Sequence, residues 1–136
     1  MIIYKVVEKR SRRGTNWILS SKMEKLKLFN DESYKKLKPY FPQYRKGRIV
    51  KAVPKSTGIL CFKTENHAKN FINGELRFNK QKAKIIKLRG IGNPKRRVVI
   101  MGHCSNFLNL IGEGFRTIKR DNPAGTIAFN SVEVLQ

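Results

Sequence analysis

The sequence has little cysteine, few acidic residues and no long apolar run, and each shortage excludes a class of protein. Only two cysteines, Cys61 and Cys104, occur in 136 residues. Two are too few for the disulfide framework of a small secreted domain. Both lie in apolar stretches, GILCF and VVIMGHC, where a reduced thiol packs as a small hydrophobe. The sequence therefore predicts reduced cysteines.

The spacing of the Cys and His residues does not favour a metal site. The four candidate zinc ligands are Cys61, His67, His103 and Cys104. Adjacent ligands at 103 and 104 would strain tetrahedral coordination, and no C-x-x-C pair supports the site. A catalytic thiol would in turn need a separate histidine base with an orienting partner. We predict no metal site, no cofactor and no catalytic residue.

Acidic residues are also scarce, since nine Asp and Glu stand against thirty Lys and Arg. Asp31 and Glu32 are the only adjacent pair, so a two-metal nuclease centre is not favoured. Carboxylates that are distant in sequence can still converge in a fold. A nucleotide- or nucleic-acid-processing enzyme therefore stays open as an alternative to a non-enzymatic protein.

Long apolar segments are absent as well. No run approaches the eighteen or so residues that a membrane span needs, and the opening MIIYKVVEKRSRR lacks the pattern of a secretory leader. We expect a cytoplasmic protein, in the host cytoplasm or the virion if it is viral, with no membrane partner.

What the sequence does have is positive charge. The formal net charge is +21 and the pI is about 10.5. Like charges destabilise a compact chain, whereas a polyanion that neutralises them releases its condensed counterions. We expect nucleic acid, RNA or DNA, as the partner, bound through phosphates with little sequence preference. A structural or assembly protein that docks on an acidic protein is the alternative.

The order of patterned segments predicts one compact α+β domain over residues 1–136, with a largely antiparallel sheet and one or two short helices. A capped helix is expected from Thr64 to Gly74, with Ala68, Phe71 and Ile72 on its apolar face. The other segments are expected to be strands or loops. Strands are expected at 2–7, 15–20, 48–53, 59–63, 83–89 and 97–101, and one or two more in the closing TIAFNSVEVL; less settled helical segments are expected at 31–37 and 105–111.

The last fifteen residues contain no Lys or Arg, so the charge is expected on everything that precedes them. Residues 9–13 are expected at the tip of a hairpin between strands 2–7 and 15–20. Residues 38–47 are expected to form a loop with a basic stretch at 44–48, and its Tyr40 and Tyr44 are the best candidates for base stacking. The predicted nucleic-acid-binding residues are Lys9, Arg10, Arg12, Arg13, Tyr44, Arg45, Lys46, Arg48, Lys95, Arg96 and Arg97.

The last three of these residues follow the segment Gly90-Ile-Gly-Asn-Pro94. Two glycines spaced by one residue can direct backbone N–H groups at an anion. The segment is neither a Walker motif nor a dinucleotide fingerprint, because no Gly-Lys-Ser/Thr and no third glycine opens a helix. We expect a turn here, either purely structural or in contact with phosphate.

Three stretches carry a resemblance: Tyr4-Lys-Val-Val7, Gly58-Ile-Leu-Cys-Phe-Lys-Thr64 running into Asn66-His-Ala-Lys-Asn-Phe71, and Gly125-Thr-Ile-Ala-Phe129. With this layout the chain resembles small uncharacterised proteins of viral and metagenomic type. The resemblance brings no activity with it. It implies an accessory or virion-associated role.

Overall fold

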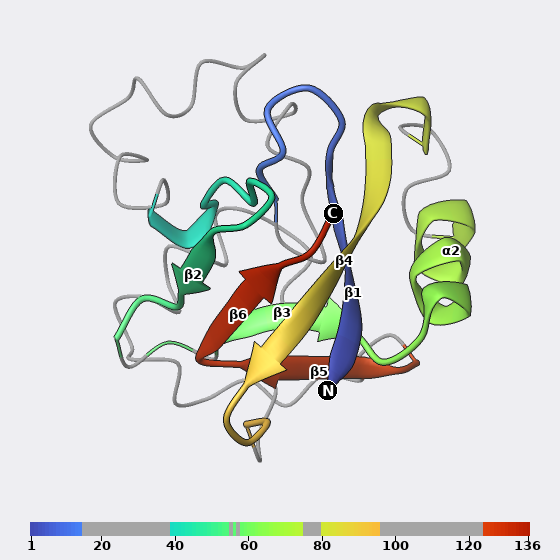
Figure 1. Ribbon diagram of the computed structural model, residues 1–136. Helices are drawn as coiled ribbons and strands as arrows, with labels where there is room; N and C mark the ends of the chain where they lie inside the picture. Colours follow the sequence, from blue (N-terminus) through green and yellow to red (C-terminus); the bar gives the residue numbers. More distant parts are fainter. Residues whose placement is uncertain (15–38, 55, 57, 75–79, 96–123) are drawn as a thin grey trace.

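Six strands and one α-helix make up the described part of the computed structural model, which covers residues 1–14, 39–54, 56, 58–74, 80–95 and 124–136. In chain order the elements are β1 (Ile2–Glu8), β2 (Ile49–Lys51), β3 (Ile59–Phe62), α2 (Glu65–Gly74), the 3-10 turn η3 (Lys80–Lys82), β4 (Ala83–Ile91), β5 (Thr126–Phe129) and β6 (Ser131–Val134). All strand pairs are antiparallel, and the sheet order is β2-β6-β4-β1-β3-β5. The expectation of a single compact α+β domain is confirmed (Figure 1).

Several expected elements are confirmed in place, and others lie outside the described residues. β1, β3 and β4 occupy the expected segments, and the closing stretch forms two strands, β5 and β6. The expected elements at 15–20, 31–37, 97–101 and 105–111 lie outside the described residues. None of the described helices is long and apolar enough to cross a membrane.

The sheet is strongly curled, because of the short connection between β5 and β6. Asn130 alone joins them, so the Cα atoms on either side of it can be at most about 7.6 Å apart. In a flat sheet, four strand spacings would separate β5 from β6 by about 19 Å. The curl brings these strands together, and β5 crosses below β6 in Figure 1.

The concave face of the curled sheet holds the main core, to which all six strands contribute. Its largest members include Ile3, Ile86, Leu88 and Phe129, none of which is exposed. Cys61 also lies in this core and is a free, buried thiol, as expected. The closing strands add Ile127, Val132 and Val134, which confirms that the cation-free end of the chain is sheet core.

Helix α2 covers part of the convex face. Its N-terminus is capped by Thr64, whose Oγ1 accepts the backbone N–H of His67 at 3.1 Å. The capping prediction is therefore confirmed. The helix buries Ala68 and Phe71 against Val6 and Phe62 of the sheet, so it covers β1, β3 and the start of β4 (Figure 1).

The turn predicted over 90–94 begins later than expected, because β4 continues through Gly90 and Ile91. Gly90 is paired with Val132 of β6, and its N–H donates to the Met1 carbonyl at 2.9 Å. That N–H cannot bind an anion as well. A Cβ atom at position 90 would lie 2.5 Å from the Phe129 ring, so the glycine is needed because the curl presses β5 onto β4. The chain turns at Gly92, whose φ is 77°.

Gly90→Ala therefore tests the close approach of β5 to β4. We expect a loss of about 1–3 kcal/mol in the free energy of unfolding, since the buried Phe129 ring must move. Gly74→Ala is the control, because a Cβ there meets nothing within 4 Å. Urea denaturation of both variants measures the difference, and equal stabilities would contradict the contact.

Candidate nucleic-acid interface

The basic segment after β1 is a tight loop organised by the side chain of Glu8. Its Oε2 accepts the backbone N–H groups of Arg10 at 2.9 Å and Ser11 at 2.5 Å. The backbone closes the loop, because the Glu8 N–H donates to the Arg13 carbonyl at 2.7 Å and the Arg12 N–H donates to the Glu8 carbonyl at 2.9 Å. Arg12 adopts a left-handed φ of 58° within this loop. Residues 9–13 thus form a defined projection from the end of β1.

A second basic loop, residues 39–48, lies against the first. The Tyr44 N–H donates to the Arg12 carbonyl at 3.0 Å, and Gln43 Nε2 donates to the Ser11 carbonyl at 3.1 Å. The backbone of Arg13 forms an isolated antiparallel β-bridge with that of Gln43. Two segments that are thirty residues apart in sequence are therefore held side by side by backbone contacts.

Two predicted binding residues, Arg12 and Arg13, have an internal role in this arrangement. Arg12 Nε donates to the Tyr44 carbonyl at 2.6 Å, and its Nη2 donates to the Gln136 carbonyl. Arg13 Nη1 donates to the Phe41 carbonyl at 2.9 Å. Both side chains are only half-buried. Their hydrogen bonds show that they join the two loops.

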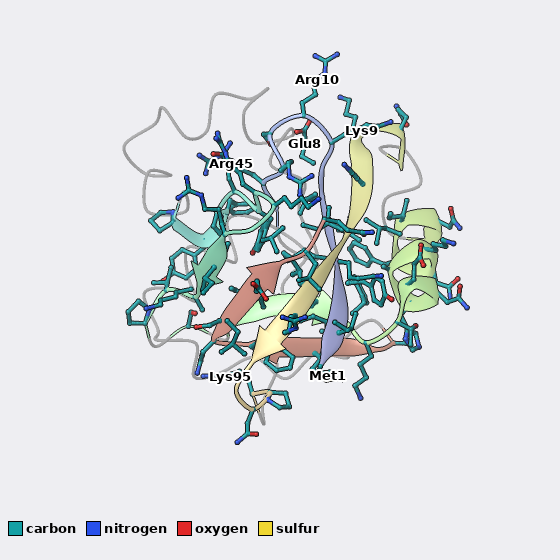
Figure 2. The ribbon with its side chains drawn as sticks, in the orientation of Figure 1. Met1, Glu8, Lys9, Arg10, Arg45 and Lys95 are labelled. Atoms are coloured by element: carbon teal, nitrogen blue, oxygen red, sulfur yellow. The ribbon has the colours of Figure 1, made fainter. Side chains whose placement is uncertain are left out.

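The remaining cations of the two loops point outward and form what we call the two-loop face. It consists of Lys9, Arg10, Arg45, Lys46 and Arg48, all exposed. Figure 2 shows Lys9 and Arg10 at the tip of one loop and Arg45 on the other. The ion pairs among the described residues are Lys69–Glu65 and Arg89–Glu133, so no described carboxylate forms an ion pair with the five cations.

Sequence reasoning missed the cations of η3 and β4 that lie next to this face. The Lys9 N–H donates to the Lys82 carbonyl at 2.7 Å, and Lys84 is paired with Val7 near the end of β1. The lysine-rich stretch was visible in the sequence. Only the register of β1 against β4 shows that it extends the same basic end of the sheet.

The prediction that Tyr44 stacks on bases is wrong. Its side chain is 2% exposed and belongs to the core of the concave face. The Tyr44 ring packs over Lys5, whose Nζ lies 5.4 Å from the ring centre in a cation–π contact. Burial raises the pKa of Tyr44 well above its usual value. Tyr44 fastens the second loop to the sheet.

Lys5 is itself a residue that the sequence did not single out. It is 1% exposed, and its Nζ donates to the Leu60 carbonyl at 2.5 Å. Burial lowers its pKa from 10.5 to about 8, against a smaller opposing effect of Cys61. A pocket of about 40 Å³ lies beside it, between Tyr40, Tyr44 and Ile59 among other residues. This space fits a few water molecules rather than a nucleotide.

Lys95 does not belong to the two-loop face. Because Glu8 is paired with Ala83 and Ile2 with Arg89, the end of β4 lies about 20 Å from the end of β1. Figure 2 shows Lys95 at the opposite end of the molecule from Lys9 and Arg10. The Lys95 N–H donates to the Ala128 carbonyl at 2.8 Å. Arg96 and Arg97 lie outside the described residues.

The described carboxylates, cysteine and histidine lie in different parts of the fold. His67 Nδ1 lies 2.8 Å from Thr64 Oγ1 at the start of α2, whereas Glu8 is held by its loop. Burial raises the pKa of the Cys61 thiol to about 11. No group of three His, Cys, Asp or Glu residues suited to a metal ion occurs in the part of the chain that the structure describes.

Comparisons with protein-family models, curated proteins and solved structures found no match for this chain. The resemblance to viral and metagenomic proteins stays a prediction, and the interpretation of the two-loop face depends on its own geometry.

Lys5 gives a prediction for the pH dependence of stability. Its pKa is about 8 in the fold against 10.5 for an unperturbed lysine, so between these values the unfolded chain binds more protons. Stability must therefore rise as pH increases through this range. Relative to Lys5→Met, the wild type should gain about 1 kcal/mol between pH 7 and pH 9. Urea denaturation at each pH measures this gain.

Above pH 9 Cys61 has the opposite effect on stability, so the comparison with Lys5→Met is confined to pH 7–9. The Cys61 pKa of about 11 in the fold, against 9.0 unperturbed, makes stability fall above pH 9 in both proteins. Parallel pH profiles for the wild type and Lys5→Met would show that Lys5 is not a buried ammonium.

Arg12→Lys tests the junction of the two loops. A lysine cannot donate to the Tyr44 and Gln136 carbonyls with the geometry of a guanidinium. We expect a loss of about 1–2 kcal/mol in stability and faster hydrogen exchange at the Tyr44 amide. Arg10→Lys, a change at the exposed tip, is the control. Equal exchange at Tyr44 in the two variants would contradict the junction.

Proposed function

We propose that the protein binds nucleic acid through phosphate contacts, with little preference for sequence and without catalysis. The observation that carries the proposal is the two-loop face, where exposed cations from two distant segments are held together at one end of the sheet. Clustered cations of this kind match the closely spaced charges of a nucleic-acid backbone.

The chemistry of the face favours phosphates over bases. Lys and Arg on exposed loops contact the backbone and position a protein without reading sequence. Of the three aromatic residues of the second loop, Tyr44 and Phe41 are buried and only Tyr40 is partly exposed, so little ring surface is available for stacking on bases. Affinity for the backbone with little base selectivity is the expected result.

The order of the two loops supports binding as well. Glu8 fixes the first loop through two N–H groups, and Arg12 and Arg13 fix the second loop against it. Backbone that is already fixed does not lose further conformational entropy on binding. The internal arginines therefore hold the exposed cations in position for the phosphates.

The proposal is tested with Arg10→Gln combined with Arg45→Gln, measured by fluorescence anisotropy on a short mixed-sequence duplex across a salt titration. The wild type should lose affinity steeply with salt. Each lost phosphate contact lowers the slope of log K against log salt by about one. The slope of the double variant should therefore fall by about two, because two contacts are removed.

The matched control is Lys63→Gln combined with Lys69→Gln, which removes two exposed cations outside the two-loop face. Its slope should stay close to that of the wild type. If the two double variants behave alike, net charge rather than this face determines binding. An affinity that does not change with salt would end the proposal.

Lys95→Gln is a separate arm of the same titration. Since Lys95 lies at the opposite end of the sheet, its removal should leave the slope of this short duplex unchanged. A single-stranded probe of the same sequence measures the preference for strandedness.

A further inference from the structure

Among the described residues, helix α2 packs on β1, β3 and the start of β4, and the convex face of β6 and β2 carries no helix. The register places Ile49, Glu133, Arg89 and Ile2 in one row across β2, β6, β4 and β1. Residues paired directly across antiparallel strands share a face, and Ile2 is on the same face as Tyr4, which packs in the cluster beneath α2. The row therefore lies on the side of the sheet that the helix covers elsewhere.

A neighbouring row adds to the same surface. Lys51, Ser131 and Ile91 are aligned across β2, β6 and β4, and Lys87 follows along β4 on the same face. We call this surface the open sheet face. It consists of Ile2, Ile49, Lys51, Lys87, Arg89, Ile91, Ser131 and Glu133.

The exposed large apolar side chains of the described residues gather on or beside this face. They are Met1, Ile2, Ile49 and Ile91, with exposed fractions of 58%, 42%, 59% and 41%. Single exposed apolar residues are ordinary, but a group of them on one face marks an interaction site.

We propose that the open sheet face binds an acidic amphipathic helix of a partner protein, seated beside α2. The neighbouring half of the face already holds a helix, whose Ala68 and Phe71 pack on the sheet. From β4 to β2 the open half is about 10 Å wide, which is the diameter of one helix with its side chains. The site thus has the dimensions of a second helix.

Charge defines the partner. The open sheet face carries three cations, Lys51, Lys87 and Arg89, and one carboxylate, Glu133. Glu133 Oε1 lies 2.8 Å from Arg89 Nη1. A partner helix with acidic residues flanking an apolar stripe matches both the cations and the isoleucines. A second copy of this chain does not, because each copy carries a net charge of +21 and would oppose cations with cations. Nucleic acid would leave the isoleucines without an apolar partner.

The test uses three labelled synthetic peptides of about 15 residues, the length at which an isolated helix becomes marginally stable. The first has an apolar stripe flanked by Glu, the second has the same composition with the stripe scrambled, and the third has Lys in place of Glu. Fluorescence anisotropy with the full chain should show binding of the first peptide alone. Equal binding of the scrambled peptide would overturn the proposal, since charge would then suffice.

Ile49→Ser combined with Ile91→Ser should weaken binding of the first peptide about tenfold. Both side chains are largely exposed, and circular dichroism checks that the fold is kept. A charge-reversing variant, Lys51→Glu, gives a second test that changes no apolar contact. Lys63→Glu, outside the face, is its matched control. Unchanged affinity in both face variants overturns the proposal.

Two further measurements identify a different occupant. If sedimentation shows that the wild type self-associates and that Ile49→Ser with Ile91→Ser does not, the face binds a second copy and the proposal fails. If the same variant loses affinity for the duplex, the face belongs to the nucleic-acid site and the proposal also fails. Duplex binding that is unchanged, together with weakened peptide binding, separates this site from the two-loop face.

Discussion

The one-residue connection between β5 and β6 is the constraint on which the rest of the structure depends. Because Asn130 must join strands that lie four positions apart in the sheet order, the sheet has to curl until β5 comes close to β6. The curl creates a concave face on which all six strands contribute to one core. It also presses Phe129 onto β4, which leaves room at position 90 for glycine alone. The same curl turns the opposite face outward, where the ten-residue helix α2 covers only part of it.

The antiparallel register then determines which basic segments can act together. The loop after β1, the start of β4 and the loop before β2 meet at one end of the sheet through hydrogen bonds from Lys9, Tyr44 and Gln43. The last residues of β4 lie at the opposite end of the sheet. Nothing in the local sequence distinguishes Lys95 from Lys46, since both are cations near a glycine. Their separation is a property of strand pairing between distant segments, and it decides which cations share a ligand.

The sequence predicted the parts of the fold that depend on local patterning. The helix cap at Thr64 and the buried strands around Cys61 and Ile86 could be found from periodicity and capping chemistry, because those signals lie within a few residues. The predictions for Gly90 and Tyr44 failed for one shared reason. Each residue is typical of a loop in its local sequence, but its place in the fold depends on residues far away in sequence. Gly90 is paired with Val132 and faces Phe129, and the buried Tyr44 ring lies over Lys5. Strand register and curl are non-local, so neither the two-loop face nor the open sheet face could be assembled from the sequence alone.

The cations of this chain occur in three different physical settings. Arg12 and Arg13 direct their guanidinium groups at backbone carbonyls and hold two loops together, so their charge is used inside the molecule. Lys5 is buried below Tyr44, and the lowering of its pKa shows the free energy that this burial costs. The exposed cations of the loops and of the open sheet face differ again in what surrounds them. On the loops five exposed cations are clustered, which suits a hydrated phosphate backbone. On the sheet they lie among exposed isoleucines, which suits a partner with its own apolar surface. The surroundings of each cation, more than the total charge, determine which kind of partner it can bind.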